Sequence, residues 1–304
     1  MKPPSAALAR AALPVALLIL AAGCTRIITY AAGRTLAVDG SLFSSEDDPE
    51  LVRQALPFGL KTLEGLISKS PEDERLLLAA ASGFTQYAFA FVQQDAEFIS
   101  AKDPSASREG LARARRLYLR ARDYGLRGLE ARHRGFTAAL AANPPSAAAS
   151  ADRADVPLLY WTAVSWAAWV ALSKDDMKAI GQLPRVEALM DRALALDEGW
   201  NGGTIHEFYV AYNGARGEAR GGGPLQAKAH LDRALALSSG RKLGPLVAYA
   251  ESVCVAAQDR KAFDELLDRV LAFDADSAPP HRLANLLAQS RARWLKSRAE
   301  DLFL

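Results

Sequence analysis

The stretch Asp191-Arg192-Ala193-Leu194-Ala195-Leu196-Asp197 decides the fold, because it occurs three times in the chain. It returns as Asp232-Arg233-Ala234-Leu235-Ala236-Leu237-Ser238 and, more weakly, as Asp268-Arg269-Val270-Leu271-Ala272-Phe273-Asp274. The copies lie 41 and 36 residues apart. This period, together with helical patterns and no strand signal, is typical of stacked helix hairpins of the tetratricopeptide type. Since one hairpin cannot bury its apolar face alone, we expect an all-α fold of stacked hairpins, an α-solenoid, over residues 47–304.

Composition narrows the class of function. Residues 1–23 hold two basic residues, Lys2 and Arg10, and without them 35 basic residues face 35 acidic ones. Nucleic-acid-binding proteins usually carry a net basic surface, so we expect no nucleic-acid partner. The two cysteines and four scattered histidines form no metal-binding motif, and we expect neither a metal nor a cofactor. No nucleophile–base pair or phosphate-binding loop stands out, so the sequence favours a protein that is not an enzyme.

The N-terminus carries a targeting signal. A basic start is followed by the apolar run Ala11 to Ala22, which has the length of a signal-peptide core and is short for a membrane span. The run ends in Leu20-Ala21-Ala22-Gly23-Cys24, which resembles the lipobox of bacterial lipoproteins. We therefore expect a signal peptide over residues 1–23, lipidation of Cys24 and a tether over residues 24–46. The alternative is an ordinary secretory signal with an incidental cysteine.

Two helical stretches carry candidate binding residues. The helix expected near residues 72–100 places Phe84 and Tyr87 on one side, and a later stretch, residues 155–173, holds Trp161 and Trp166. These four aromatic side chains predict either core packing or the wall of an apolar ligand groove. We also expect His206, next to Glu207, to be a polar residue of this ligand groove; the alternative is a structural role. Adjacent helical residues diverge by about 100°, which argues against an acid–base pair.

The helix expected over residues 105–132 is amphipathic. Its small and aromatic positions lie on one side, and nearly opposite them, by helical spacing, lie four arginines: Arg113, Arg116, Arg120 and Arg127. We interpret this face either as a docking surface for an acidic partner or lipid headgroups, or as an ordinary solvated face. The alanine-rich stretch 138–154 contains Asn143-Pro144-Pro145 and is expected to be a loop that forms a soft boundary within the helical domain.

Several short stretches along the expected mature chain share the pattern of one family. They run from Asp47-Asp48-Pro49-Glu50 and Ala55-Leu56-Pro57-Phe58 through Leu159-Tyr160-Trp161 and Ile205-His206-Glu207 to Asn285 and Trp294. In these residues the chain resembles the T-component family of TRAP transporters, the TatT-like periplasmic lipoproteins. The resemblance implies an all-helical, lipid-anchored periplasmic protein that is not an enzyme. It also implies a trimer with a pore, which pairs with the substrate-binding protein of a tripartite ATP-independent transporter and passes it a hydrophobic or organic-acid ligand.

A second hypothesis comes from another class of protein. Tetratricopeptide-like lipoproteins also act as scaffolds in envelope assembly, without a small-molecule ligand. In that case the aromatic side chains are core and the arginine face makes the contact.

The residue after the lipobox cysteine bears on the location of the anchor. Thr25 at this position favours the outer membrane.

Overall fold

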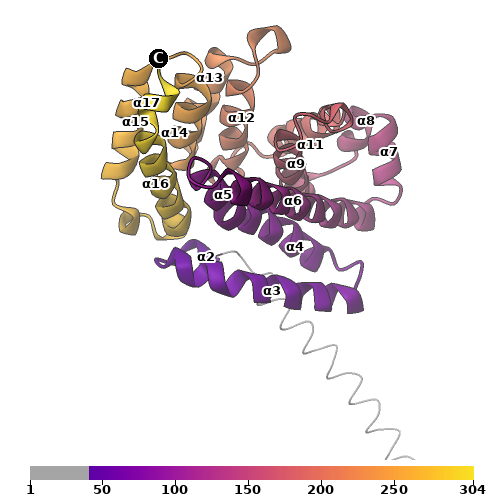
Figure 1. Cartoon of the computed structure of the whole chain (residues 1–304). Helices are drawn as coiled ribbons and strands as arrows, with labels where there is room; N and C mark the ends of the chain where they lie inside the picture. Colours follow the sequence, from indigo (N-terminus) through magenta and orange to yellow (C-terminus); the bar gives the residue numbers. More distant parts are fainter. Residues whose placement is uncertain (1–40) are drawn as a thin grey trace, which may run out of the picture.

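The computed structural model describes residues 41–304, so the expected signal peptide, Cys24 and most of the tether lie outside the described residues. The described part of the chain is mostly helical and contains no strand, which confirms the all-α prediction (Figure 1). Its longer helices are α3 (Pro49–Lys69), α4 (Glu74–Tyr87), α6 (Pro104–Arg132), α9 (Val156–Ala171), α11 (Leu183–Leu196), α12 (Thr204–Gly214), α13 (Pro224–Leu237), α15 (Arg260–Ala272) and α16 (Arg282–Ser297). Shorter ones are α2 (Ser41–Ser44), α5 (Gln94–Phe98), α7 (Phe136–Ala142), α8 (Pro144–Ala149), α10 (Met177–Ile180), α14 (Gly244–Tyr249) and α17 (Ala299–Leu302).

Aspartates set the starts of the three N-terminal helices. Asp48, Asp73 and Asp103 each accept hydrogen bonds from two backbone N–H groups in the first turn of α3, α4 and α6. Pro49 and Pro104 occupy first helical positions, where a missing N–H costs nothing. Such caps contribute about 1 kcal/mol each. The helix starts thus follow from local chemistry that is visible in the sequence.

The helix expected near residues 72–100 is continuous but not regular. It contains a π-helical turn, η1 (Ala88–Gln93), between α4 and α5. The combined stretch Glu74–Phe98 is the one described helix long and apolar enough to cross a membrane, and 61% of its most apolar window is buried inside the protein. Burial of that extent is what a core helix has, and this helix packs between α3 and α6.

The three copies of the repeated stretch occupy equivalent places. They end α11, α13 and α15, which are followed by α12, α14 and α16. The small or β-branched residues at the third position of each copy, Ala193, Ala234 and Val270, are buried. The repeat therefore marks three successive helix pairs. Whether their stacking is that of a tetratricopeptide solenoid stays a prediction.

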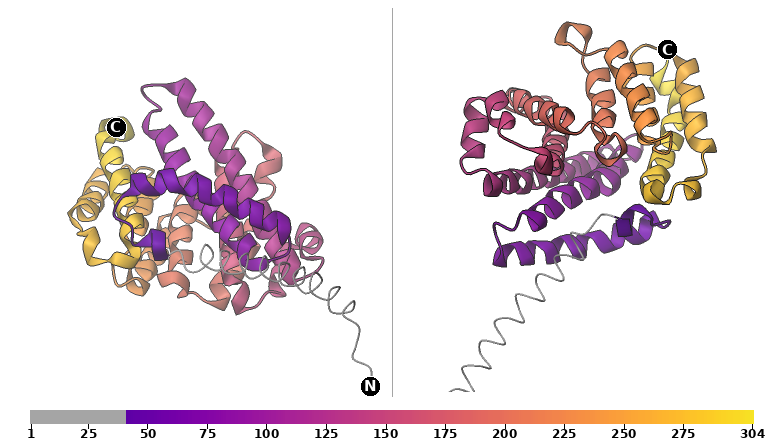
Figure 2. Two further views of the ribbon diagram at one scale, coloured as in Figure 1. Left: turned by 90° about the horizontal axis from the view of Figure 1, so that it is seen from below. Right: turned by 180° about the vertical axis from the view of Figure 1, so that it is seen from behind.

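The last long helix returns to the first ones. Leu283 and Leu287 of α16 pack against the apolar cluster of α3, α4 and α6. The Arg282 guanidinium donates to the Ser45 carbonyl at 3.2 Å, and Arg291 pairs with Glu97 at the end of α5. Figure 2 shows the C-terminal helices beside the N-terminal layer. The described array is thus joined at its two ends.

The expectation of a loop over residues 138–154 is wrong. The segment forms α7 and α8, and Asn143 ends the first of these helices and caps the second by accepting from the Ser146 N–H at 3.3 Å. Alanine is the best helix former, and a proline pair fits a first helical turn as well as it fits a loop. Leu140 and Ala147 are buried in one cluster with residues of α6 and α9, so this segment is part of the packed core.

Candidate functional site

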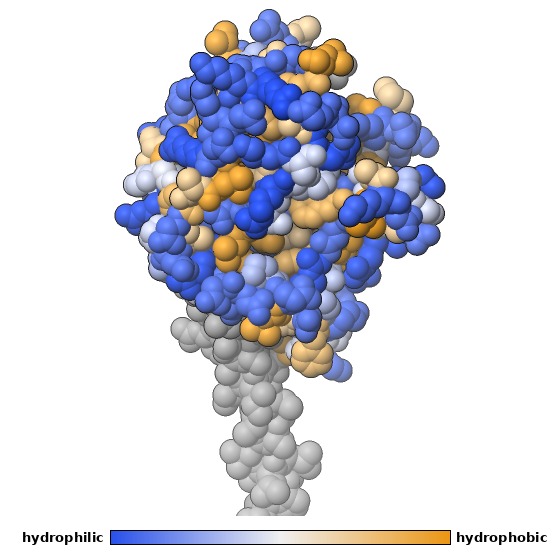
Figure 3. All heavy atoms as spheres, turned by 60° about the vertical axis from the view of Figure 1, so that its left-hand side comes forward, coloured by the Kyte–Doolittle hydropathy of each residue, from blue (hydrophilic) through white to orange (hydrophobic). Residues whose placement is uncertain are grey.

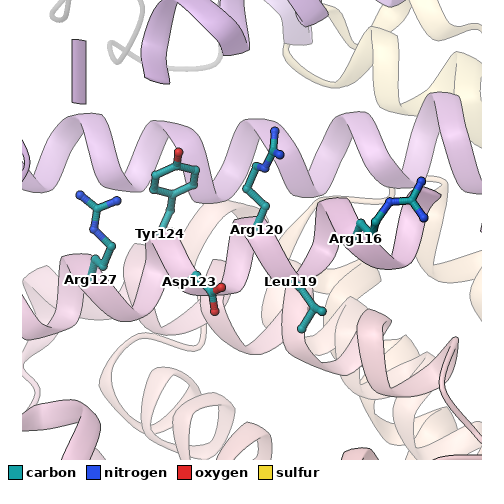
Figure 4. Close-up of a pocket in the computed structure, with 6 residues that line it drawn as sticks. All are labelled: Arg116, Leu119, Arg120, Asp123, Tyr124 and Arg127. Atoms are coloured by element: carbon teal, nitrogen blue, oxygen red, sulfur yellow. The ribbon is translucent and has the colours of Figure 1, made fainter. Parts of the chain in front are cut away.

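An open groove of about 360 Å³ lies along the exposed side of α6. Figure 4 shows its side chains projecting from successive turns of this helix. The groove is lined by Arg116, Leu119, Arg120, Asp123, Tyr124 and Arg127. Three positive charges and one negative charge give it a net positive character. It therefore suits an anionic ligand or an acidic protein surface.

Two of the groove arginines are held from behind by aromatic rings. The Arg120 guanidinium lies 5.4 Å from the centroid of the Phe84 ring, and that of Arg127 lies 5.4 Å from the centroid of Tyr124. Arg127 also donates to the Pro71 carbonyl at 3.0 Å. Cation–π contacts of this kind orient a guanidinium while leaving its N–H donors able to bind.

A carboxylate from α3 anchors the same group. Tyr124 donates its hydroxyl to Glu64 at 2.9 Å, and Arg120 lies 3.5 Å from that carboxylate. Burial, and then the hydrogen bond to Glu64, raise the pKa of Tyr124 to about 12. Burial alone would raise the pKa of Glu64, but hydrogen bonds from Lys61 and Tyr124 and the Arg120 charge lower it. Glu64 therefore stays ionised and keeps the tyrosine and the arginine in place.

The remaining two predicted arginines differ from each other. Arg116 lines the groove and makes no ion pair or hydrogen bond with any residue in the described range 41–304. Arg113 does not line the groove; it donates to the Tyr87 hydroxyl at 3.2 Å and lies over that ring. The structure thus gathers three of the four predicted arginines in one place, and Arg116 is the one with no partner there. Their docking role stays a prediction.

Most of the predicted groove aromatics are buried, and they lie in different places. Phe84 and Tyr87 belong to the cluster beneath α6, whereas Trp166 lies in the cluster around α9 and α11. The Trp166 indole N–H donates to Gln182 at 2.9 Å, which satisfies its one polar group. These three side chains do not form a common wall. Their placement is that of the core-packing alternative.

Trp161 is the half-buried member of the predicted set, and it has aromatic neighbours. The ring of Tyr160 lies 5.0 Å from that of Trp161 and 4.9 Å from that of Trp200, which is also half-buried. Sequence reasoning did not select Trp200. Its position in the sequence could have pointed to it. Trp200 closely follows the first copy of the repeated stretch, where a polar loop residue would normally be expected.

His206 is buried and faces a second histidine. Its Nδ1 lies 2.8 Å from Nδ1 of His230 on α13, and its Nε2 lies 3.4 Å from Glu198. Burial lowers the pKa of both histidines, and that of His230 falls to about 4. The Tyr209 ring stacks on His230 at 4.8 Å. His206 therefore joins α12 to α13 as a neutral, hydrogen-bonded side chain.

Glu207 points into a different environment from His206, as the helical spacing predicted. Burial raises the pKa of Glu207 although the Lys242 charge opposes this, and burial lowers the pKa of Lys242. Lys242 donates to the Asn201 carbonyl at 2.7 Å and to the Thr204 hydroxyl. The Glu207 carboxylate also contributes to the raised pKa of Tyr160. A half-buried acid and base thus lie near the aromatic group of Tyr160.

No group of three histidine, cysteine, aspartate or glutamate side chains in residues 41–304 is arranged to hold a metal ion. Cys254 is a buried free thiol, and burial raises its pKa to about 11. This cysteine is therefore unreactive at neutral pH.

The described chain is an all-helical array with an arginine groove exposed on α6. Residues 45–303 match the model of the TRAP transporter T-component family. A protein of Treponema pallidum (strain Nichols), described as an uncharacterized protein, is 33% identical over 267 residues, 86% of this chain and 83% of the relative. The chain belongs to the TRAP transporter T-component family. Its role therefore lies in a TRAP transport system, and the family is one of transport accessory proteins rather than enzymes.

Proposed function

We propose that this protein is a lipid-anchored periplasmic component of its TRAP system that docks the substrate-binding protein through the arginine groove of α6. Cys24 carries the anchor, which holds the chain at the outer membrane. The observation that carries the docking proposal is the exposed Arg116 beside Arg120 and Arg127. Arginine is enriched at protein interfaces, and a positive groove steers an acidic partner to it.

The docking proposal is tested by reversing the charge of Arg116. Binding of the cognate substrate-binding protein is measured by calorimetry at two salt concentrations. Arg116→Glu is expected to weaken binding roughly tenfold or more, and higher salt to reduce the difference. Arg293→Glu makes the same charge change at an exposed position of α16 and serves as the control. Equal binding by the wild type and both variants would rule out the α6 groove as the docking site.

We further propose that the ligand is an organic acid with an apolar part, bound beside Trp161. Ligand sites are mostly apolar and aromatic, with a few polar groups that orient the ligand. Trp161, Tyr160 and Trp200 supply the aromatic part, and the Lys242 ammonium is the nearby positive charge. The Glu207 carboxyl, whose pKa burial raises, adds a second polar group.

Native mass spectrometry of the chain lacking residues 1–24 tests the ligand and the oligomer together. The expected result is a trimer that carries a co-purified small acid, and Trp161→Ala is expected to lose that acid while its thermal unfolding stays close to that of the wild type. A ligand-free monomer would instead favour the scaffold alternative. The burial of Phe84, Tyr87, Trp166 and His206 is the observation that supports that alternative.

A further inference from the structure

Helix α3 has a second apolar face that the described chain does not cover. Leu51 and Phe58 are exposed by 55% and 80%, and Ala55 between them is also exposed. At about 100° per residue these three positions fall within 60° of one another. The opposite face buries Val52, Leu60, Leu63 and Ile67. The N-terminal half of α3 is thus apolar on two sides, and only one of them packs against the protein.

This face differs from the other exposed apolar positions. Phe89, Met177 and Leu225 are also exposed, but each lies on a different element. The face drawn in Figure 3 is mostly hydrophilic, with apolar side chains between the polar ones. Single exposed apolar residues are normal in soluble proteins, whereas Leu51, Ala55 and Phe58 lie together on one helical stripe. This stripe is therefore a candidate contact surface.

The position of α3 in the chain indicates which occupant fits. It is the first long helix of the described residues and forms the outermost layer below α4 and α6 (Figure 2). Cys24 lies 25 residues before Pro49 in the sequence. At 3.3–3.6 Å per residue, a link of that length can reach at most about 80–90 Å, so α3 can contact any membrane that holds Cys24.

The charges on the same stripe agree with a membrane. Lys69, in the last turn of α3, lies in line with Leu51 by helical spacing, is exposed, and has no ion pair or hydrogen bond with another residue in 41–304. Lys61, at the edge of this face, is 71% exposed but pairs with Glu64, so the headgroup contact is assigned to Lys69. Amphipathic helices that lie on membranes combine apolar side chains with lysines that reach lipid phosphates.

We propose that the outer face of α3 rests on the lipid bilayer, with Leu51 and Phe58 entering the interfacial zone and Lys69 meeting the headgroup phosphates. The proposal rests on the proposed lipidation of Cys24. The acyl chains supply the attachment, and α3 supplies the orientation, because an anchor at a single residue does not fix which side of the domain faces the membrane. The contact thus determines which way the groove of α6 faces.

The test places a reporter at position 58 of the full, processed chain in vesicles of phosphatidylethanolamine and phosphatidylglycerol. Phe58→Cys carries an environment-sensitive fluorophore, and the buried Cys254 stays unlabelled in the folded protein. Leu225→Cys, at a position of α13 that is 78% exposed, is the matched control. We expect blue-shifted emission at 58 and quenching by lipid-borne quenchers roughly threefold greater than at 225. Leu51→Gln is expected to reduce the quenching at 58.

Three outcomes separate this inference from the proposal on which it rests. Mass spectrometry of the N-terminal peptide first establishes whether Cys24 is acylated; an unmodified cysteine contradicts the anchor itself. With an acylated chain, equal quenching at 58 and 225 overturns the α3 contact and leaves the anchor intact. A blue shift at 58 without lipid quenching overturns it too, because a second copy or another protein then covers the face.

Discussion

In the groove region, α3 to α6, Arg116 faces solvent and its neighbours rest on the rings of Phe84 and Tyr124. In the repeat region, α11 to α16, polar side chains turn toward one another instead. His206 meets His230 there, and both Tyr212 and Arg216 donate to one carboxylate, that of Glu187. His206 and Glu187 thus have their polar atoms taken up inside the protein, whereas Arg116 does not. We therefore expect substitution of Arg116 to change binding, and substitution of His206 or Glu187 to change stability.

The largest expected effect concerns the core of the repeat region. Phe263 is fully buried and packs edge-on against Phe303, with ring centroids 5.0 Å apart. Phe263→Ala is expected to lower the free energy of unfolding by about 3–5 kcal/mol, because it removes apolar contacts and leaves a cavity. Arg116→Ala in the groove is expected to change it by less than about 0.5 kcal/mol. Urea unfolding followed by circular dichroism measures both, and similar losses would erase the distinction between the regions.

The next effect tests how closely the repeat region is packed. A Cβ added to Gly244, at the start of α14, would lie 1.9 Å from Oε1 of Glu207, so the carboxylate must move. Gly244→Ala is expected to cost about 1–2 kcal/mol. In a Glu207→Ala background the same change should cost clearly less, because the obstructing atom is gone. Thermal unfolding of the four proteins in this cycle gives the coupling, and purely additive losses would contradict the close approach.

Acid is expected to weaken the repeat region through its histidine pair. The pKa of His230 is about 4 in the folded protein and near 6.5 when unfolded, so between these values only the unfolded chain takes up a proton. The contribution of the neutral His230 ring to the free energy of unfolding is fully present above pH 6.5, and it is lost as the pH falls toward 4. The facing groups are His206, Glu198, Arg233 and Tyr209. The free energy of unfolding is expected to fall by about 1–2 kcal/mol over this pH range.

The pH effect is measured as the difference between the wild type and His230→Gln in urea unfolding from pH 7 to 4.5. The variant lacks the second titrating ring, so its stability should fall less over this range. If the free energy of unfolding depends on pH equally in the two proteins, or rises in the wild type on acidification, the histidine pair does not cause the loss of stability in acid.

The smallest effect belongs to the groove region and has the opposite sign. Gly65 lies within α3, and a Cβ at this position would meet no atom within 4 Å. Gly65→Ala is expected to raise the free energy of unfolding by about 0.5–1 kcal/mol, because alanine reduces the freedom of the unfolded chain and fits the helix. Differential scanning calorimetry would detect it as a higher melting temperature. A loss of stability would indicate that this surface of α3 is less open than the structure indicates.

Helix positions and one surface were predictable because they depend on residues close together in the sequence. The spacing of Arg116, Arg120 and Arg127 along the helix expected over residues 105–132 is a local pattern, and the structure places these three side chains together on α6. The stretch 138–154 was misread because its prolines and alanines fit a loop and a short helix equally well. The helical pattern thus predicted the face that these arginines share, and their docking role stays a prediction.

Local patterns could not decide whether the predicted aromatic residues form a groove or the core. Whether Trp161 or Trp166 is accessible depends on segments far along the chain, such as Gln182 beside Trp166 and Trp200 near Tyr160. The pairing of His206 with His230 joins residues 24 apart on different helices. No periodicity within one helix encodes such contacts. Aromatic composition alone therefore cannot separate a core from a groove.

The return of α16 to the first helices has a consequence for the order of folding. Leu283 and Leu287 complete the apolar cluster of α3 and α4, and Arg282 bonds to the carbonyl of Ser45, 237 residues earlier. Because the chain is synthesised from its N-terminus, this cluster must wait, incompletely covered, until nearly all of the protein has emerged. Contacts between such distant segments form late and slow the folding of a domain. When α16 packs against the first helices, it therefore also covers the apolar cluster of α3 and α4 and ends the period in which that cluster can aggregate.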